Sequence, residues 1–265
     1  REKEASSYPA MHACHVIAIT SGKGGVGKTN FTVNFAIALA RLGKKVIVFD
    51  ADLGLANIDV LLGSCPVINL GNVIKGEAKL QNIIMEGPEG IKIVPGGSGL
   101  SELTNLDAEE INGFVREIIE IENTTDYLLI DTGAGLAKDV MSFVLAANEI
   151  FVLSTADPTS ITDAYATIKY VSLVNRTKDL QLVVNAVDNQ NDADQVARKL
   201  AIAAKQFLGI ELAYFGFVYN DNAVTKAVRE QKPFVISYPR SEAAKCIYNL
   251  AAKLSKRDAE RRNSK

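Results

Sequence analysis

The chain has 265 residues, of which 48% are hydrophobic and 23% are charged, and its formal net charge is −2. This size and apolar content are enough for one large α/β domain, and the near-neutral charge argues against a surface devoted to nucleic acid. Cys14, Cys65 and Cys246 lie far apart without a C-x-x-C pair. We therefore expect reduced thiols in a cytoplasmic protein, without a disulfide framework or a metal cluster.

The first part of the chain predicts an arm, a strand and a helix. Residues 1–13 are polar and irregular, which is typical of a disordered N-terminal arm. A strand is expected at 14–20, followed by a glycine-rich loop. Apolar residues then recur at helical spacing, and Gly43 offers a left-handed stop. The residues of this buried stripe are Phe31, Phe35, Ala38 and Leu42.

Later apolar runs predict strands that are covered on both faces, as parallel strands are. These runs are residues 45–50, 91–94, 127–131, 150–153 and 180–184. Short helices are expected at 58–62 and 70–74, and a glycine-rich loop at 95–99. The alternation of strands and helices predicts a single α/β domain with a mostly parallel, doubly wound sheet and helices on both faces.

Two capping patterns predict helix starts, and an apolar stripe predicts the last helix. Asp107 precedes Glu110, and Ser160 precedes Asp163, each at capping-box spacing. The stripe of the last helix is Ala244, Ile247, Leu250, Ala251 and Leu254. Residues 255–265 are polar and basic, so we expect a solvated tail there and place the folded domain at 14–254.

Residues 21–29, SGKGGVGKT, predict a phosphate-binding loop between the first strand and the first helix, so we expect the single α/β domain to be a P-loop NTPase. Glycines allow backbone N–H groups to converge on one point, and the helix N-terminus adds its positive dipole end. Lys28 is expected to reach the β- and γ-phosphates, and the Thr29 hydroxyl to hold Mg²⁺. Residues 22–27 also spell G-x-G-x-x-G, the dinucleotide fingerprint, but that interpretation explains neither Lys28 nor Thr29.

Aspartates follow two of the predicted strands, at the edge of the sheet where ligands bind. We expect Asp50 and Asp131 to lie in the Mg²⁺ shell and Asp52 to orient the water that attacks the γ-phosphate. The reverse assignment of Asp50 and Asp52 stays open. Lys23 is a second lysine near the start of the loop, where contact with its own nucleotide is awkward. We expect it to reach a nucleotide held by a second molecule.

Residues 23–29 resemble the deviant Walker A motif of the MinD/ParA ATPases, and the resemblance covers residues 14–254. Three further segments, 50–59, 131–135 and 158–165, are similar to the flagellar-number branch of that family, known as FlhG, FleN or YlxH. The resemblance implies a slow ATPase that uses ATP and Mg²⁺, forms a homodimer with ATP bound, and helps to set flagellar number and placement.

The resemblance also assigns roles to residues of this chain. It implies that Asn185 recognises adenine, that Lys23 acts across the dimer and that Asp52 is the hydrolytic aspartate. Catalytic residues are then Asp52, Lys23 and Lys28, and metal ligands are Thr29, Asp50 and Asp131. The nucleotide-binding residues are Gly24, Gly25, Val26, Gly27, Lys28, Thr29, Asn30 and Asn185.

Implied partners are an FlhF-like flagellar GTPase, proteins of the flagellar switch complex and, in some members, a transcription activator. No specific nucleic acid is implied. The sequence departs from the family in three places: no D-Q-A-x-x-L-R motif precedes His12, residues 219–221 replace a proline-containing loop, and residues 255–265 lack an amphipathic helix. Because such a tail buries little apolar surface, we do not expect it to hold a membrane, and peripheral contact with the inner face of the membrane stays open.

Two other functions are kept as alternatives, and a third is excluded. Septum-site placement or plasmid and chromosome partitioning would use the same ATPase core. A nucleotide-gated scaffold or transcriptional antagonist would use hydrolysis only as a timer. Iron–sulfur scaffold proteins share the loop but need clustered cysteines, which this chain does not supply.

Overall fold

The computed structural model describes residues 14–52, 58–63, 67–97, 108–121 and 124–263. The predicted arm at 1–13, the capping residue Asp107 and Cys65 lie outside this part of the chain. The same holds for residues 53–57, which follow Asp52, and for 98–99 of the predicted glycine-rich loop.

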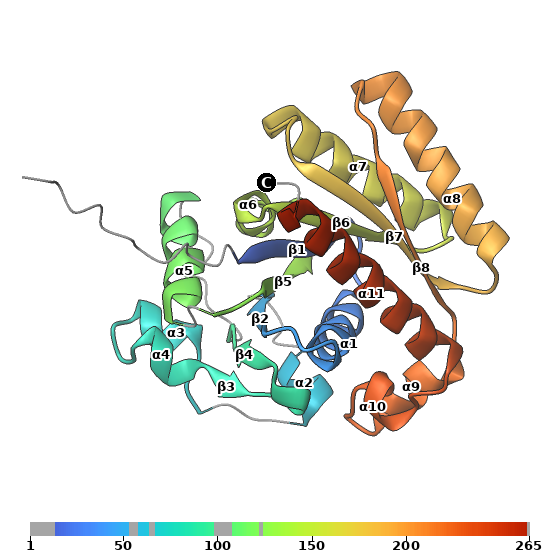
Figure 1. Ribbon diagram of the computed structural model, residues 1–265. Helices are drawn as coiled ribbons and strands as arrows, with labels where there is room; N and C mark the ends of the chain where they lie inside the picture. Colours follow the sequence, from blue (N-terminus) through green and yellow to red (C-terminus); the bar gives the residue numbers. More distant parts are fainter. Residues whose placement is uncertain (1–13, 53–57, 64–66, 98–107, 122–123, 264–265) are drawn as a thin grey trace, which may run out of the picture.

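Within the described residues, eight strands form one sheet in the order β3-β4-β2-β5-β1-β6-β7-β8 (Figure 1). All neighbours are parallel except the pair β3 and β4. The central strands are buried along almost their whole length, which explains their continuous apolar sequences and confirms the predicted fold class. The strands are β1 (His15–Ser21), β2 (Val46–Ala51), β3 (Met85–Glu86), β4 (Lys92–Val94), β5 (Tyr127–Ala134), β6 (Glu149–Ser154), β7 (Asp179–Val187) and β8 (Ala213–Tyr219).

Helices cover both faces of the sheet (Figure 1). On one face α1 and α11 pack against each other, with α9 and α10 beside them, and on the other face α3 to α8 form two further core clusters. The helices are α1 (Lys28–Arg41), α2 (Ile58–Leu62), α3 (Leu70–Ile74), α4 (Leu80–Ile83), α5 (Ala108–Ile121), α6 (Lys138–Ala146), α7 (Pro158–Val174), α8 (Gln190–Ala203), α9 (Asn222–Arg229), α10 (Phe234–Ser237) and α11 (Glu242–Asn263), with a 3-10 turn at Pro88–Gly90 and a π-helical turn at Ala204–Leu208.

Two details of helix ends differ from the sequence prediction. Gly43 has φ 77° and stops α1 as predicted, but Leu42 is the C-cap and is 47% exposed, so it does not belong to the buried stripe. Helix α7 begins at Pro158, because proline is preorganised for the first helical position, and Ser160 is not its N-cap. The Ser160 hydroxyl instead accepts the backbone N–H of Thr155 at 3.0 Å.

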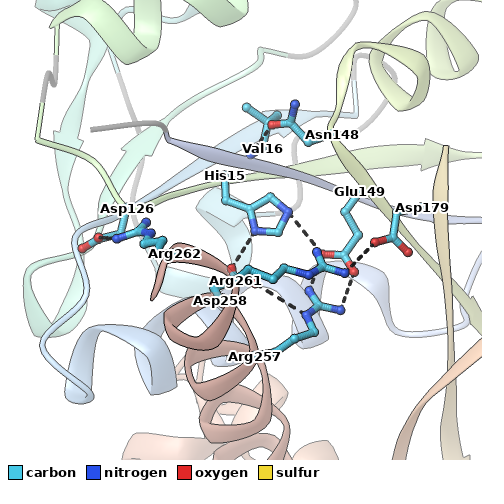
Figure 2. A network of polar contacts seen from close by, with 10 residues as sticks. All are labelled: His15, Val16, Asp126, Asn148, Glu149, Asp179, Arg257, Asp258, Arg261 and Arg262. Carbon is cyan, nitrogen blue, oxygen red and sulfur yellow. Dashed lines mark hydrogen bonds and ion pairs between the residues drawn. The ribbon is translucent and has the colours of Figure 1, made fainter. Parts of the chain in front are cut away.

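The predicted solvated tail is wrong for residues 255–263, which continue α11 to Asn263. Arg257 donates two hydrogen bonds, at 2.7 and 2.6 Å, to the carboxylate of Glu149, which is 1% exposed (Figure 2). The three arginines of this segment pair with acids in or beside the sheet, whereas Lys256 pairs with Glu260 of α11 itself. No described helix, α11 included, combines the length and apolar character that crossing a bilayer would require.

The end of α11 and the starting ends of four strands form a polar network, the α11 clamp (Figure 2). At its centre His15 contacts Asp258 of α11 through Nδ1 at 2.7 Å and Glu149 of β6 through Nε2 at 3.2 Å. Around it Arg257 binds Glu149, Arg261 binds Asp179 of β7, and Arg262 binds Asp126 beside β5. Two cations and two carboxylates thus balance one another in the buried centre, as burial of charge requires.

The clamp is expected to weaken as the pH rises. Burial opposes a charged His15, but its hydrogen bonds with Asp258 and Glu149 outweigh burial and raise its pKa to about 9. In the unfolded chain the pKa returns to its ordinary value of 6.5, so the stabilisation is complete below that pH and is lost as the pH rises through 9. The free energy of unfolding should fall by up to about 3 kcal/mol from this cause.

Denaturant unfolding at about pH 6 and about pH 10 measures this loss. A His15→Gln variant cannot carry the charge, so its free energy of unfolding should change less between the two conditions. The same pH dependence in both proteins would contradict the assignment of the loss to His15.

Candidate nucleotide site

Residues 22–27 turn between β1 and α1 in a conformation that needs glycine. Gly25 and Gly27 have φ of 77° and 94°, in the left-handed region, and Gly27 is the N-cap of α1. The first turn of α1 contains no acid, so its N–H groups and the helix dipole are available to an anion. The predicted phosphate loop has the backbone that phosphate binding requires.

Lys28 opens α1 and is buried beneath this loop, with 8% exposed. Its Nζ donates to Ser21 Oγ at 3.1 Å, and Ser21 in turn donates to the Lys23 carbonyl at 2.7 Å. Burial lowers the pKa of Lys28, while the charges of Asp131 and Asp52 oppose that effect. A partly desolvated ammonium at this position favours the approach of an anionic phosphate.

Asp131 lies within β5 and is fully buried beside the first turns of α1. Thr32 Oγ1 donates to Asp131 Oδ1 at 3.1 Å, and Oδ2 has no hydrogen-bond partner among the described residues. Burial raises the pKa of Asp131 to about 6, and the Thr29 hydroxyl and the Lys28 charge oppose that rise. A buried carboxylate oxygen without a partner, beside Thr29, fits a Mg²⁺ ion that keeps several waters.

Asp50 and Asp52 join Asp131 at this edge of the sheet. Asp50 pairs in register with Asp131, and its two oxygens accept the backbone N–H groups of Asp52 at 3.2 Å and Ile58 at 3.4 Å. Burial, followed by the charge of Asp131, raises the pKa of Asp50 well above its usual range. The Asp50 carboxylate therefore holds the chain that follows β2, and its place in a metal shell stays a prediction.

The carboxylate of Asp52 faces the backbone that follows Asp131. It is half-buried, and a Cβ added at Gly133 would lie 3.6 Å from Asp52 Oδ1. Its charge also acts on the pKa of Lys28 and of Asp131. Asp52 is thus close to the two groups that would surround a γ-phosphate, which is where a water-orienting carboxylate must lie.

A cavity of about 220 Å³, the base cavity, lies between the phosphate loop and the ends of β7 and β8. Asn185 lines it and donates from Nδ2 to the Val26 carbonyl at 2.7 Å. Strand β7 is irregular here, because Ala186 has φ 54° and the pairing with β8 shifts after Val184. The predicted binding residues that line this cavity are Gly25, Val26, Gly27, Asn30 and Asn185.

Lys23 is exposed, and its side chain turns away from the cavity beside the loop. Its Nζ donates to Thr159 Oγ1 at 3.0 Å, in the first turn of α7. The preceding Gly22 packs so closely on α7 that an added Cβ would lie 2.2 Å from the Asp163 carbonyl oxygen. Lys23 is therefore held on the surface of α7, apart from Lys28 and Asp131.

A comparison with known families agrees with this geometry. The model of the CobQ/CobB/MinD/ParA nucleotide-binding domain matches residues 17–234. The chain belongs to the MinD/ParA family. Antiactivator FleN of Pseudomonas aeruginosa is 40% identical over 245 residues, which are 92% of this chain and 88% of FleN. The flagellum site-determining protein YlxH of Helicobacter pylori is 42% identical over 219 residues, which are 82% of this chain and 73% of YlxH.

A solved structure connects the MinD/ParA fold with nucleotide and metal. MinD of Pyrococcus horikoshii, solved as a complex with Mg-ADP, matches with a TM-score of 0.77 and 26% identity over 91% of this chain and 96% of that one. Together with the family match, it confirms the predicted ATPase class and the predicted cofactors, ATP and Mg²⁺. The roles of the individual site residues stay predictions.

Three features of the MinD/ParA-type site were missed by sequence reasoning. Ser21 holds the Lys28 ammonium, Thr32 holds Asp131, and the irregular backbone at Ala186 lies beside Asn185. Ser21 and Thr32 could have been found from their places, since Ser21 is the first residue of the loop and Thr32 lies one helical turn after Lys28. Nothing in the sequence predicts the positive φ of Ala186.

Proposed function

We propose that this chain is an ATP-dependent dimerising switch ATPase that regulates the number and placement of flagella. The observation that carries the flagellar role is the identity of 40% and 42% with FleN and YlxH over most of the chain. The MinD of Bacillus subtilis, which is a septum site-determining protein, is 29% identical over a similar length. The flagellar branch is therefore favoured over septum placement.

For ATP hydrolysis, each group of site residues has a role that follows from its position in the site. The loop N–H groups and Lys28 bind the β- and γ-phosphates and offset their charge, while Asn185 and the base cavity hold adenine. Thr29 and Asp131, with Asp50 behind them, would hold Mg²⁺, which would neutralise charge that develops on the phosphates. Asp52 orients the attacking water.

The place of Lys23 supports dimerisation with ATP bound. Its ammonium is exposed on α7 and does not reach the base cavity or Lys28 of its own chain, so we assign it to the phosphates of a twin molecule. Hydrolysis removes the γ-phosphate that Lys23 would contact, and the two copies separate. Partners of the ATP dimer are an FlhF-like GTPase, flagellar switch-complex proteins and a transcription activator, in keeping with the name antiactivator that FleN carries.

Removal of the gene from its host tests the flagellar role. We expect the number or position of flagella per cell, counted by electron microscopy, to change, and the wild-type gene to restore it. A gene copy that encodes Asp52→Ala should not restore normal numbers, because the switch cannot turn over. Normal flagella together with misplaced division septa in the deletion strain would contradict the proposal.

A further inference from the structure

The segment at residues 219–222, called the wall below, runs from the end of β8 to the start of α9 and lines two cavities. One is the base cavity, and the other is a more open, polar cavity of about 570 Å³. Tyr219, Asn220 and Asp221 line both cavities. Tyr219 packs against two of the core clusters, and its ring lies 4.9 Å from that of Phe217. Asn220 and Asp221 are polar and belong to none of these clusters, so their position depends on their hydrogen bonds.

Asp221 supplies two of these hydrogen bonds through one carboxylate. Its Oδ1 accepts the N–H of Ala223 at 2.8 Å, which caps α9, and its Oδ2 accepts the N–H of Ala243 at 3.2 Å, in the first turn of α11. The N-termini of both helices carry partial positive charge and unpaired N–H groups, so a single anion satisfies both. The carboxylate thereby joins the wall to two helices whose first residues, Asn222 and Glu242, are 20 positions apart in the chain.

The wall is also joined to β7, which carries Asn185. Asn220 donates its backbone N–H to the Val187 carbonyl at 2.8 Å and its side-chain Nδ2 to Asp188 Oδ1 at 3.0 Å. These bonds hold one edge of the wall against β7, so the wall could still move relative to α9 and α11. The hydrogen bonds of Asp221 to these two helices prevent that movement.

We propose that Asp221 is a positioning residue of the base cavity: it fixes the wall at 219–222 so that the cavity keeps the shape of a purine. The inference deepens the proposed function, since it takes adenine to lie between Asn185 and this wall. Because each oxygen already accepts a backbone N–H, Asp221 acts through the wall and not on the base. Its loss should therefore weaken binding of the base while leaving binding of the phosphates intact.

Titration calorimetry with two ligands separates these effects. MgADP uses both the base cavity and the phosphate loop, and magnesium tripolyphosphate uses only the loop. We expect Asp221→Ala to bind MgADP about tenfold more weakly, in line with the loss of a helix cap, and tripolyphosphate as the wild type does. Asp221→Asn keeps one acceptor and should lose about threefold, so it carries the test if the alanine variant does not fold.

The control is Glu242→Gln, which removes a carboxylate from the same open cavity but from a side chain that pairs with Lys245 of its own helix. It should bind both ligands normally. Unchanged MgADP affinity in the Asp221 variants, or an equal loss for both ligands, would overturn the inference. An Asn185→Ala variant tells the two proposals apart. If Asn185→Ala binds MgADP normally, the proposal that adenine lies in the base cavity is wrong. If Asn185→Ala loses MgADP affinity and the Asp221 variants do not, only the positioning role of Asp221 is wrong.

Discussion

An Asp52→Ala variant is expected to hydrolyse ATP about 10² to 10³ times more slowly than the wild type and to bind MgADP equally well. The carboxylate faces Gly133 and lies near Lys28 and Asp131, where it can orient a water at the γ-phosphate. That contact matters only in the transition state, so its loss lowers kcat and spares ground-state binding. Phosphate release at saturating MgATP, with calorimetry of MgADP, measures both quantities.

The matched variant is Asp50→Ala, which decides between the two assignments left open by the sequence. Asp50 is fully buried and accepts the N–H groups of Asp52 and Ile58, so its removal should lower the free energy of unfolding and weaken nucleotide binding together. If Asp50→Ala instead loses only turnover, and Asp52→Ala keeps it, the roles of the two aspartates are reversed.

A Lys23→Ala variant is expected to bind MgADP as a monomer but to lose ATP-driven dimerisation. Lys23 is exposed and held by Thr159, while the phosphate loop, Lys28 and the base cavity do not depend on its side chain. Removing a cation that neutralises phosphate charge between two copies leaves that charge unopposed in the dimer. Light scattering with ATP should report a dimer mass for the wild type and a monomer mass for the variant.

Lys199→Ala is the control, since it removes an exposed lysine from α8, away from the loop. It should dimerise with ATP like the wild type. If Lys23→Ala still forms a full dimer with ATP, Lys23 does not act on the nucleotide of a second molecule. The Asp52→Ala protein, held as an ATP dimer, further tests the scaffold alternative: if it binds and inhibits its regulator without turnover, hydrolysis serves only as a timer.

The parts of the fold that could be predicted are those in which one segment carries its own signal. Strands β1, β2, β5, β6 and β7 are continuous apolar runs, and the loop at 21–29 has constrained residues in sequence. The edge strand β8 was not predicted, because its residues are mostly half-exposed and Gly216 interrupts it with φ 150°. An edge strand is not buried on both faces, so it lacks the continuous apolar sequence from which the inner strands can be predicted.

The remaining features depend on residues that are far apart in the chain. His15 and Asp258 are separated by 243 positions, so their contact, and with it the helical end of α11, is invisible to periodicity. The same holds for the 159 positions between Val26 and Asn185 in the base cavity. A pattern of hydrophobicity alone predicts a solvated segment wherever the residues are polar. It cannot show that such residues become buried by pairing with charges elsewhere in the chain.

The α11 clamp binds the starting ends of β1, β5, β6 and β7, and the other ends of those same strands lead to the phosphate loop, Asp131, Thr155 and Asn185. A frame held at one end by ion pairs has little conformational entropy left to lose when a ligand arrives at the other. The ordering that accompanies ATP binding should therefore fall on the connecting loops and on the contact with a second copy, and affinity is gained through rigidity already present in the free chain.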